Sequence, residues 1–300
     1  MKLKAAFLLA SWLALPGTAA WAQDEAPVQL SGTLLKARTS GSVIVAHRES
    51  SIPFSYLSPR GVPIGYSIEL CKKLVDAMSE AVGKPLGITW LPVTSESRID
   101  AIASGQADLE CGSTTNNLER AKRVAFSPTT FVAGTKLMVK KGSPIASFRD
   151  LKGKTVVVTA GTTNEQAMRE IIRRFGIQFE IKVARDHAES FAELAAGRVD
   201  AFATDDVLLY GLIAKNDAKG QYFVIGEFLS YDPYGIMYRK GDAQMAKLVN
   251  DTFHDLAEDG EVERQYKRWF MTRLPSGASI DLPMSPQLET LIRTMAAKPE

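Results

Sequence analysis

The sequence contains few of the residues that bind metals. Its 300 residues include two cysteines and three histidines. No C-x-x-C motif is present and the histidines are dispersed, so the ligand spacings typical of zinc sites are missing. We therefore expect neither a metal site nor another bound cofactor.

Long apolar segments are also scarce. Residues 5–15 form one apolar stretch, which follows Lys2 and Lys4 and precedes Ala20-Trp21-Ala22, the arrangement of a cleavable secretory signal. The stretch is shorter than the ~20 residues that a membrane helix needs, and no later segment supplies such a run. The residue directly after the cleavage point is not a cysteine, so the new N-terminus could not carry a lipid. We predict that residues 1–22 are a signal peptide and that the mature protein is exported and soluble.

An excess of charge of either sign is missing as well. The chain has 36 basic and 34 acidic side chains, and two of the lysines lie in the predicted signal peptide, so the mature chain is neutral. Nucleic acids and anionic membranes select for positively charged surfaces. We therefore expect neither as a partner.

The two cysteines have two interpretations. Cys71 lies on a predicted helix and Cys111 at the end of a predicted strand, and helices pack on sheets in this class of fold. An exported protein meets an oxidising compartment, where the pair could form one disulfide. They could equally be two buried thiols that behave as small apolar side chains. The sequence leaves both interpretations open.

Short β-branched runs alternate with helical patterns in two successive blocks. In the first block, strands are predicted at residues 43–45, 88–93 and 107–110, with helices at 68–82 and 95–103. In the second block, strands are predicted at residues 155–159, 179–183 and 199–203, with helices at 162–175, 189–195 and 206–214. The order βαβαβ predicts an α/β fold with a parallel, doubly wound sheet in each block and helices on both faces.

Two extended segments join the blocks. Residues 131–139 cross from the first block to the second, and residues 233–238 cross back, followed by helices that complete the first block. Two crossings predict two lobes joined by a two-strand hinge. We place the first lobe at residues 31–132 together with 231–300, and the second at residues 135–227.

Polar residues follow the predicted strands of both blocks, where ligands bind in open α/β sheets. These residues are Arg48, Ser95, Ser113, Thr115, Thr163, His187 and Asp205. Arg98 and Arg120 lie close by, on the helices that follow. A guanidinium matches a carboxylate in geometry, so three convergent arginines predict an anion with more than one carboxylate. A small dicarboxylate such as glutamate or aspartate fits.

Several of these residues also have a plain structural interpretation. Arg98 could form a surface ion pair with Glu96 or Asp100. His187 could cap the next helix, and Asp205 could be a helix N-cap favoured by the dipole. The hydroxyl groups are not placed as nucleophiles, because no G-x-S-x-G motif is present. We therefore expect no catalytic residue.

The same segments resemble the periplasmic solute-binding proteins of polar amino acid ABC transporters, most closely the glutamate/aspartate-binding members. The resemblance extends from about Gly41 to Phe270 and rests on His47–Ser51, Pro53–Tyr56, Gly65–Ser67, Glu110–Asn117, Gly161–Thr163 and Asp186-His187. It implies a two-lobed, Venus-flytrap fold with a two-strand hinge. It also implies a monomer in the periplasm that delivers L-glutamate or L-aspartate to an inner-membrane ABC permease.

The resemblance further implies a role for each of the nine residues. The ligand α-carboxylate would be held by Arg120, Thr115 and Thr163. The α-amino group would be received by Ser113 and Asp205. The side-chain carboxylate would be held by Arg48, Ser95, Arg98 and His187. In relatives that bind basic amino acids, the position that matches Arg48 is acidic.

The alternative function is enzymatic, because a few relatives are periplasmic dehydratases of cyclic carboxylates. A dehydratase needs a general acid or base near an apolar ring site. This sequence has arginines and hydroxyls there instead. We therefore favour a binding protein.

Overall fold

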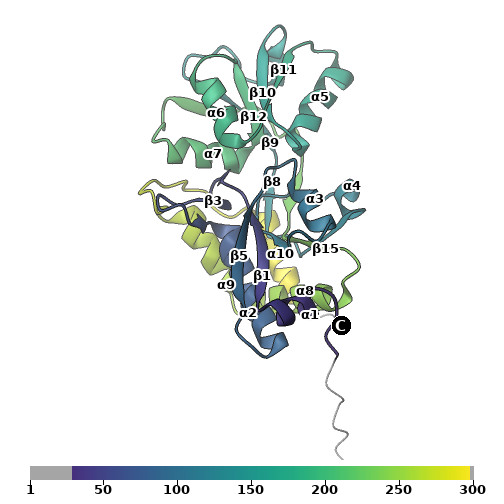
Figure 1. The fold of residues 1–300 in the computed structure, drawn as a ribbon. Helices are drawn as coiled ribbons and strands as arrows, with labels where there is room; N and C mark the ends of the chain where they lie inside the picture. The colour runs from purple at the N-terminus through teal and green to yellow at the C-terminus, as the bar shows by residue number, and fades with distance from the viewer. Residues whose placement is uncertain (1–28, 298–300) are drawn as a thin grey trace, which may run out of the picture.

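The computed structural model describes residues 29–297 and consists of two α/β lobes, one above the other in Figure 1. The predicted signal peptide, residues 1–22, lies outside the described residues. Within residues 29–297, no helix is long and apolar enough to cross a membrane. The predicted two-lobed fold is confirmed, whereas the residue limits that we gave for the lobes stay a prediction.

The first lobe is built on a five-stranded sheet in the order β5-β1-β6-β15-β7. These strands are β5 (Gly87–Pro92), β1 (Ser42–His47), β6 (Leu109–Glu110), β15 (Met237–Arg239) and β7 (Val124–Phe126). The helices of this lobe are α1 (Gly32–Ser40), α2 (Tyr66–Val82), α3 (Arg98–Ala103), α4 (Leu118–Ala121), α8 (Ala243–Glu258), α9 (Glu261–Tyr266) and α10 (Pro286–Ala296), and a π-helical turn (Lys267–Met271) follows α9. A small sheet of β2 (Ser50–Ser51), β3 (Ser55–Leu57) and β4 (Pro63–Ile64) follows β1. Val43 and Val45 of β1 are fully buried, which explains the β-branched run there.

The second lobe repeats this plan with the sheet β11-β10-β12-β9-β13. Its strands are β11 (Glu180–Ala184), β10 (Thr155–Thr159), β12 (Ala201–Asp205), β9 (Thr135–Lys140) and β13 (Tyr222–Ile225). Its α-helices are α5 (Thr163–Phe175), α6 (His187–Ala195) and α7 (Asp206–Lys215), and a 3₁₀ turn spans Phe148–Leu151. As predicted, β10, β11 and β12 each lead directly into a helix.

One strand in each sheet runs against the other four. The strands that the sequence assigned to the two parallel sheets pair in parallel as predicted, β1 with β5 and β6, and β10 with β11 and β12. β15 pairs antiparallel with β6 and β7, and β9 pairs antiparallel with β12 and β13. Both strands come directly after a crossing segment, and they enter their sheets from the hinge. The other strands run in the opposite direction, so their carboxyl ends face the space between the lobes.

The hinge is a pair of short antiparallel strands, β8 (Phe131–Ala133) and β14 (Asp232–Tyr234). Their aromatic residues are anchored in the first lobe, where the ring of Phe54 lies 4.9 Å from that of Phe131 and 5.1 Å from that of Tyr234. Phe270 packs against Phe131 at 5.0 Å. The predicted two-strand hinge is therefore confirmed, and its aromatic side chains tie it to the first lobe.

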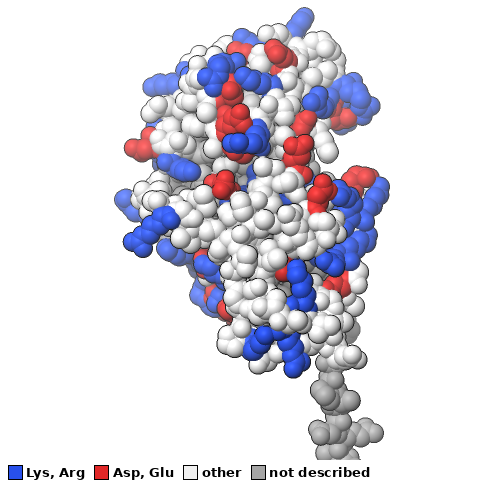
Figure 2. All heavy atoms as spheres, in the orientation of Figure 1, with Lys and Arg blue, Asp and Glu red and all other residues white. Residues whose placement is uncertain are grey.

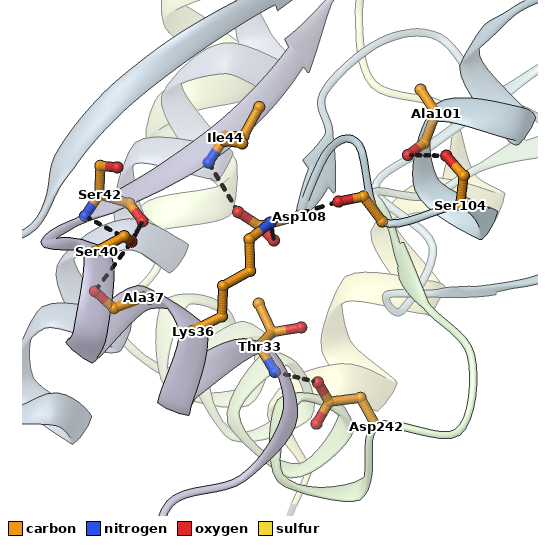
Figure 3. Close-up of polar contacts among 11 residues, drawn as sticks. Thr33, Lys36, Ala37, Ser40, Ser42, Ile44, Ala101, Ser104, Asp108 and Asp242 are labelled. Atoms are coloured by element: carbon orange, nitrogen blue, oxygen red, sulfur yellow. Dashed lines mark hydrogen bonds and ion pairs between the residues drawn. The ribbon is translucent and has the colours of Figure 1, made fainter.

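Helix α1 was not predicted, because its residues form no apolar stripe. Figure 3 shows the polar contacts that hold it in place. The backbone N–H of Thr33 donates to Asp242 at 2.7 Å, and Lys36 pairs with Asp108 at 2.7 Å. The second oxygen of Asp108 accepts from the backbone N–H of Ile44 in β1 at 2.9 Å. Residues far apart in the sequence therefore fix α1 to the first lobe.

Cys71 and Cys111 form a disulfide, which resolves the choice that the sequence left open. The bridge joins α2 to the residue after β6, and both side chains are buried. Cys111 directly precedes the loop Gly112–Thr115. The disulfide therefore anchors this loop to a helix of the first lobe.

Candidate ligand-binding site

A small, partly open cavity of about 10 Å³ lies where the two lobes meet. The first lobe lines it with Ser95, Arg98, Ser113 and Thr115, and the second with Thr162, Thr163, Asn164, His187, Asp205 and Leu208. Seven of the nine residues singled out in the sequence are therefore brought together here.

Arg98 forms the charged wall on the side of the first lobe. It is the first residue of α3, so the helix predicted from Ser95 begins three residues later. Ser95 instead lies in a turn closed by bonds between Thr94 and Ser97. Arg98 is buried, and its Nη1 donates to the carbonyl of Ser113 at 3.2 Å. A solvated surface ion pair, the plain interpretation of Arg98, is therefore wrong.

Several donors on or behind this wall have no hydrogen-bond partner among residues 29–297. They are Nε of Arg98, Nη1 of Arg48 and the hydroxyl groups of Ser95 and Ser113. An unpaired buried polar atom costs about 1–3 kcal/mol, so native proteins rarely keep several together without a role. A carboxylate ligand, which only accepts hydrogen bonds, is the kind of group that would satisfy them.

Arg48 follows β1 and is almost completely buried, although it does not line the cavity itself. Its backbone N–H donates to the hydroxyl of Ser55 at 2.9 Å, which fixes the end of the strand. Burial and the nearby positive charge of Arg98 lower the pKa of Arg48 to about 9. A guanidinium so perturbed still carries its charge at neutral pH, and it would gain from an added anion.

Arg120 connects the two lobes instead of lining the cavity. Its Nη1 donates to the carbonyl of Thr115 at 2.9 Å, and its Nη2 donates to the carbonyl of Gly161 at 3.2 Å. Thr115 belongs to the first lobe, and Gly161 lies between β10 and α5 of the second. The hydroxyl groups of Thr115 and Thr163 also meet across the lobes at 3.3 Å. The guanidinium therefore contacts Thr115, which in turn meets Thr163, the two threonines with which the resemblance groups it.

The contributions of the second lobe come from the starts of three helices. Thr163 is the first residue of α5, and His187 is the first residue of α6. Asp205 ends β12 directly before α7. The backbone N–H groups at such helix starts favour negative charge. This end of the cavity is thus suited to an anion even without a cation of its own.

His187 is neutral in this site. Burial, followed by the charges of Arg48 and Arg98, lowers the pKa of its ring well below the usual value. Its Nδ1 lies 2.9 Å from the hydroxyl of Thr159, which leaves Nε2 for a ligand. The N-cap of α6 is Asp186, whose side chain accepts from Glu189. His187 is therefore not the cap, which was its plain interpretation.

Asp205 is the acid of the cavity, and its side chain makes no capping bond to α7. Its carboxylate accepts from Nδ2 of Asn164 at 2.7 Å and from the hydroxyl of Tyr234. Burial, and then the negative charge of Asp232, raises the pKa of Asp205 to about 7. A neighbouring ammonium group would stabilise its ionised form.

Two buried acids near the site were missed by the sequence analysis. Asp232, on the hinge strand β14, accepts from the hydroxyl of Thr115 at 3.1 Å and also from Ser230. Glu110, at the end of β6, accepts from the hydroxyl of Thr114 at 2.7 Å. Glu110 had a signal in the sequence, since it is an acidic residue at the end of a predicted strand, whereas Asp232 lies just before the predicted extended segment and had none.

One group of possible metal ligands occurs among the described residues, away from the cavity. It consists of His254, Asp255 and Glu258 on α8, and both acidic side chains are exposed. The Nδ1 atom of His254 lies 3.0 Å from the carbonyl of Met295, so the ring already has a partner. The arrangement has the features of an ordinary solvated helix surface.

Comparison with known proteins identifies the family. Residues 43–272 match the family described as bacterial extracellular solute-binding proteins, family 3. The chain belongs to this family. Solute-binding proteins of this kind bring two α/β lobes together around a small molecule, which agrees with the cavity found here.

Three similar proteins indicate which members of the family the chain resembles. The chain is 43% identical to an L-glutamate/L-aspartate-binding protein of Pseudomonas aeruginosa, over 90% of each chain. It is 41% identical to a glutamate/aspartate import solute-binding protein of Salmonella typhimurium, over 91% of each chain. A solved structure of an ancestral amino acid-binding protein, a precursor of cyclohexadienyl dehydratase, is 30% identical with a TM-score of 0.69. The match covers 79% of this chain and 99% of that one.

Proposed function

We propose that this family 3 solute-binding protein is the substrate-binding component of an ABC importer, and that its ligand is L-glutamate or L-aspartate. The observation that carries the proposal is the pair of buried arginines, Arg48 and Arg98, beside a cavity between the lobes. Arg48 and Arg98 both have guanidinium atoms without a hydrogen-bond partner in the described part of the chain. Relatives 41–43% identical are named for the same two amino acids.

For the ligand groups we propose the assignment that the family resemblance implies. The α-carboxylate would lie with Arg120, Thr115 and Thr163, which meet where the lobes touch. The side-chain carboxylate would lie with Arg48, Arg98, Ser95 and the neutral ring of His187. The ammonium group would lie between Ser113 and the carboxylate of Asp205. Each end of the ligand would then contact both lobes, which favours their closure.

The alternative, a dehydratase, gains some weight from the ancestral relative described as a precursor of cyclohexadienyl dehydratase. The pKa of Asp205, about 7, would suit a general acid or base. Against this, both oxygens of Asp205 already accept hydrogen bonds, and nine of the ten residues that line the cavity are polar. We therefore propose a binding protein without catalytic activity.

The direct test is calorimetric titration of the ligand-free mature protein with each of the twenty amino acids. We expect glutamate and aspartate to bind at least a hundredfold more tightly than any basic or apolar amino acid, since a buried guanidinium without its anion is costly. Tightest binding of a basic amino acid would refute the proposal. Turnover of a cyclic carboxylate by the same sample would favour the dehydratase.

The cellular setting is part of the proposal. We propose that residues 1–22 direct export and are removed, that the mature protein is a monomer in the periplasm, and that it delivers its ligand to an inner-membrane permease. Mass spectrometry of the periplasmic fraction should find a chain that begins at Gln23. A chain that retains Met1 in the cytoplasm would contradict this.

A further inference from the structure

Glu110 is a buried carboxylate that the assignments above do not use. It is fully buried at the end of β6. Its Oε2 accepts from the hydroxyl of Thr114, whereas Oε1 has no hydrogen-bond partner among the residues described. No basic group in residues 29–297 forms an ion pair with it within 4.0 Å. Buried carboxylates are usually paired, so its position calls for an explanation.

The carboxylate lies directly behind the wall of the cavity. A Cβ atom placed on Gly112 would collide with Oε1 of Glu110 and would lie 3.0 Å from Cγ of Arg48. Glycine at this position therefore lets the loop pass between the acid and the arginine. The next residue, Ser113, lines the cavity, and its carbonyl accepts from Arg98. Glu110 and Arg48 thus both lie against Gly112, next to a residue that lines the cavity.

The charge of Glu110 reaches the whole arginine cluster. Arg98 repels both Arg48 and Arg120, and this repulsion helps to lower the pKa values of those two side chains. The negative charge of Glu110 opposes the lowering of the pKa at Arg48, Arg98 and Arg120 alike. It is therefore a counter-charge shared by three cations and contributed by the protein itself.

We propose that Glu110 is a specificity-determining residue, a fixed counter-charge that limits how strongly the site prefers an acidic amino acid over its amide. Without a ligand, it stabilises three buried cations. With glutamate bound, it repels the ligand's side-chain carboxylate, and with glutamine bound this repulsion is missing. Specificity is a difference of affinities. The charge of Glu110 should therefore change the ratio of the affinity for glutamate to the affinity for glutamine. The proposal rests on the proposed function, because it assumes an acidic amino acid in the cavity.

The test is Glu110→Gln in the full mature protein, titrated calorimetrically with glutamate and with glutamine. The amide has the shape of the carboxylate and can still accept from Thr114, so the change removes mainly charge. We expect the ratio of the Kd for glutamine to the Kd for glutamate to rise about tenfold, the effect of one charge at protein dielectric. We also expect a lower melting temperature without ligand.

A matched control is Glu119→Gln on α4. This residue neighbours Arg120 in the sequence, but its side chain is 81% exposed and pairs with Lys122. Solvent and salt screen such a charge, so the ratio should stay within about twofold of the wild-type value.

An unchanged or smaller ratio in Glu110→Gln would overturn the proposal. Wild-type protein that binds neither ligand would instead refute the proposed function, so the two failures are distinguishable. If Glu110→Gln does not fold, the double variant Glu110→Gln, Arg48→Gln tests whether the loss of the counter-charge is the cause. The counter-charge account expects the double variant to fold, because one repelling cation is gone. A double variant that is equally unfolded would overturn it.

Discussion

The two lobes contribute different chemistry to the same cavity. The first lobe supplies positive charge through Arg48, Arg98 and Arg120, all largely buried or held by hydrogen bonds. The second lobe supplies the starts of helices, with a hydroxyl, a neutral imidazole and an acid. The difference indicates which lobe distinguishes an acid from its amide. Charge-assisted bonds come from the first lobe, whereas the second offers donors that serve both ligands.

The lobes also differ in how well they obey local rules. In the second lobe, helix α5 begins with a threonine cap and an acidic first turn, both favourable to a helix start. In the first lobe, Arg98 is the first residue of α3, where a cation opposes the helix dipole. Such a local conflict is expected at functional sites. It marks the first lobe as the one that is adapted to the ligand's charge.

The largest predicted effect concerns a bond that only the first lobe contains. Replacing both Cys71 and Cys111 by serine opens a loop of 40 residues. By the chain-entropy argument this should lower the free energy of unfolding by about 4 kcal/mol, measured by urea denaturation. The double variant should also bind glutamate more weakly, because the disulfide anchors the loop that carries Ser113 and Thr115. Unchanged stability would show that packing alone holds this loop.

The second prediction concerns Arg120, which contacts residues of both lobes. Arg120→Ala removes the guanidinium that contacts both Thr115 and Gly161, and it leaves the α-carboxylate of the ligand without its charged partner. Affinity should fall at least a hundredfold for every amino acid that binds, because an uncompensated buried charge costs several kcal/mol. Calorimetric titration measures this.

The control for this change is Arg123→Ala. This side chain is exposed and pairs with Asp100 at the surface, so affinity should change by less than about twofold. Normal glutamate binding by Arg120→Ala would show that the α-carboxylate lies elsewhere.

The acid of the second lobe predicts a dependence on pH. Burial and Asp232 raise the pKa of Asp205 to about 7 in the ligand-free protein, while Asn164 and Tyr234 oppose the shift through hydrogen bonds. In the proposed assignment the ionised form receives the ligand's ammonium group, so a proton would leave when glutamate binds below pH 7. Affinity should therefore rise between pH 6 and pH 7, by at most about tenfold, and level off above.

Titration at pH 6.5 in two buffers of different ionisation enthalpy would detect the released proton. In the ligand-free protein the sign is reversed: a raised carboxyl pKa stabilises the fold at low pH, and this contribution is lost as the pH rises toward 7. Asp205→Asn should bind more weakly and show no pH dependence from this source. A wild-type affinity that falls from pH 6 to pH 7 would contradict the assignment.

Much of the fold could be predicted from local patterns. The valine-rich run at 155–159 and the helix after it are found where the sequence places them, because each has its own turn signals. Strand direction has no such signal. β9 and β15 look like any other strand, and only the crossings before them reverse their direction. Helix α1 could not be predicted because it has no apolar stripe. Polar contacts with Asp108 and Asp242 hold it in place instead.

The candidate site was predictable in part, and for a similar reason. Residues that follow strands, such as Ser113 and His187, could be placed at the cavity by topology alone. Glu110 and Asp232 could not, because their importance depends on arginines and threonines that are distant in the sequence. The relation between Arg120 and Gly161 was equally hidden, since it exists only when the lobes meet.

The most direct test of the division between the lobes compares Arg48→Gln with His187→Gln. For each variant and for wild-type protein, calorimetry gives the ratio of the Kd for glutamine to the Kd for glutamate. Arg48→Gln removes a charge-assisted interaction that only the acid makes, so this ratio should fall at least about tenfold. His187→Gln exchanges one neutral donor for another, so both affinities should drop together and the ratio should stay within about threefold. Equal losses for both ligands in Arg48→Gln, or an equal fall of the ratio in His187→Gln, would contradict the account.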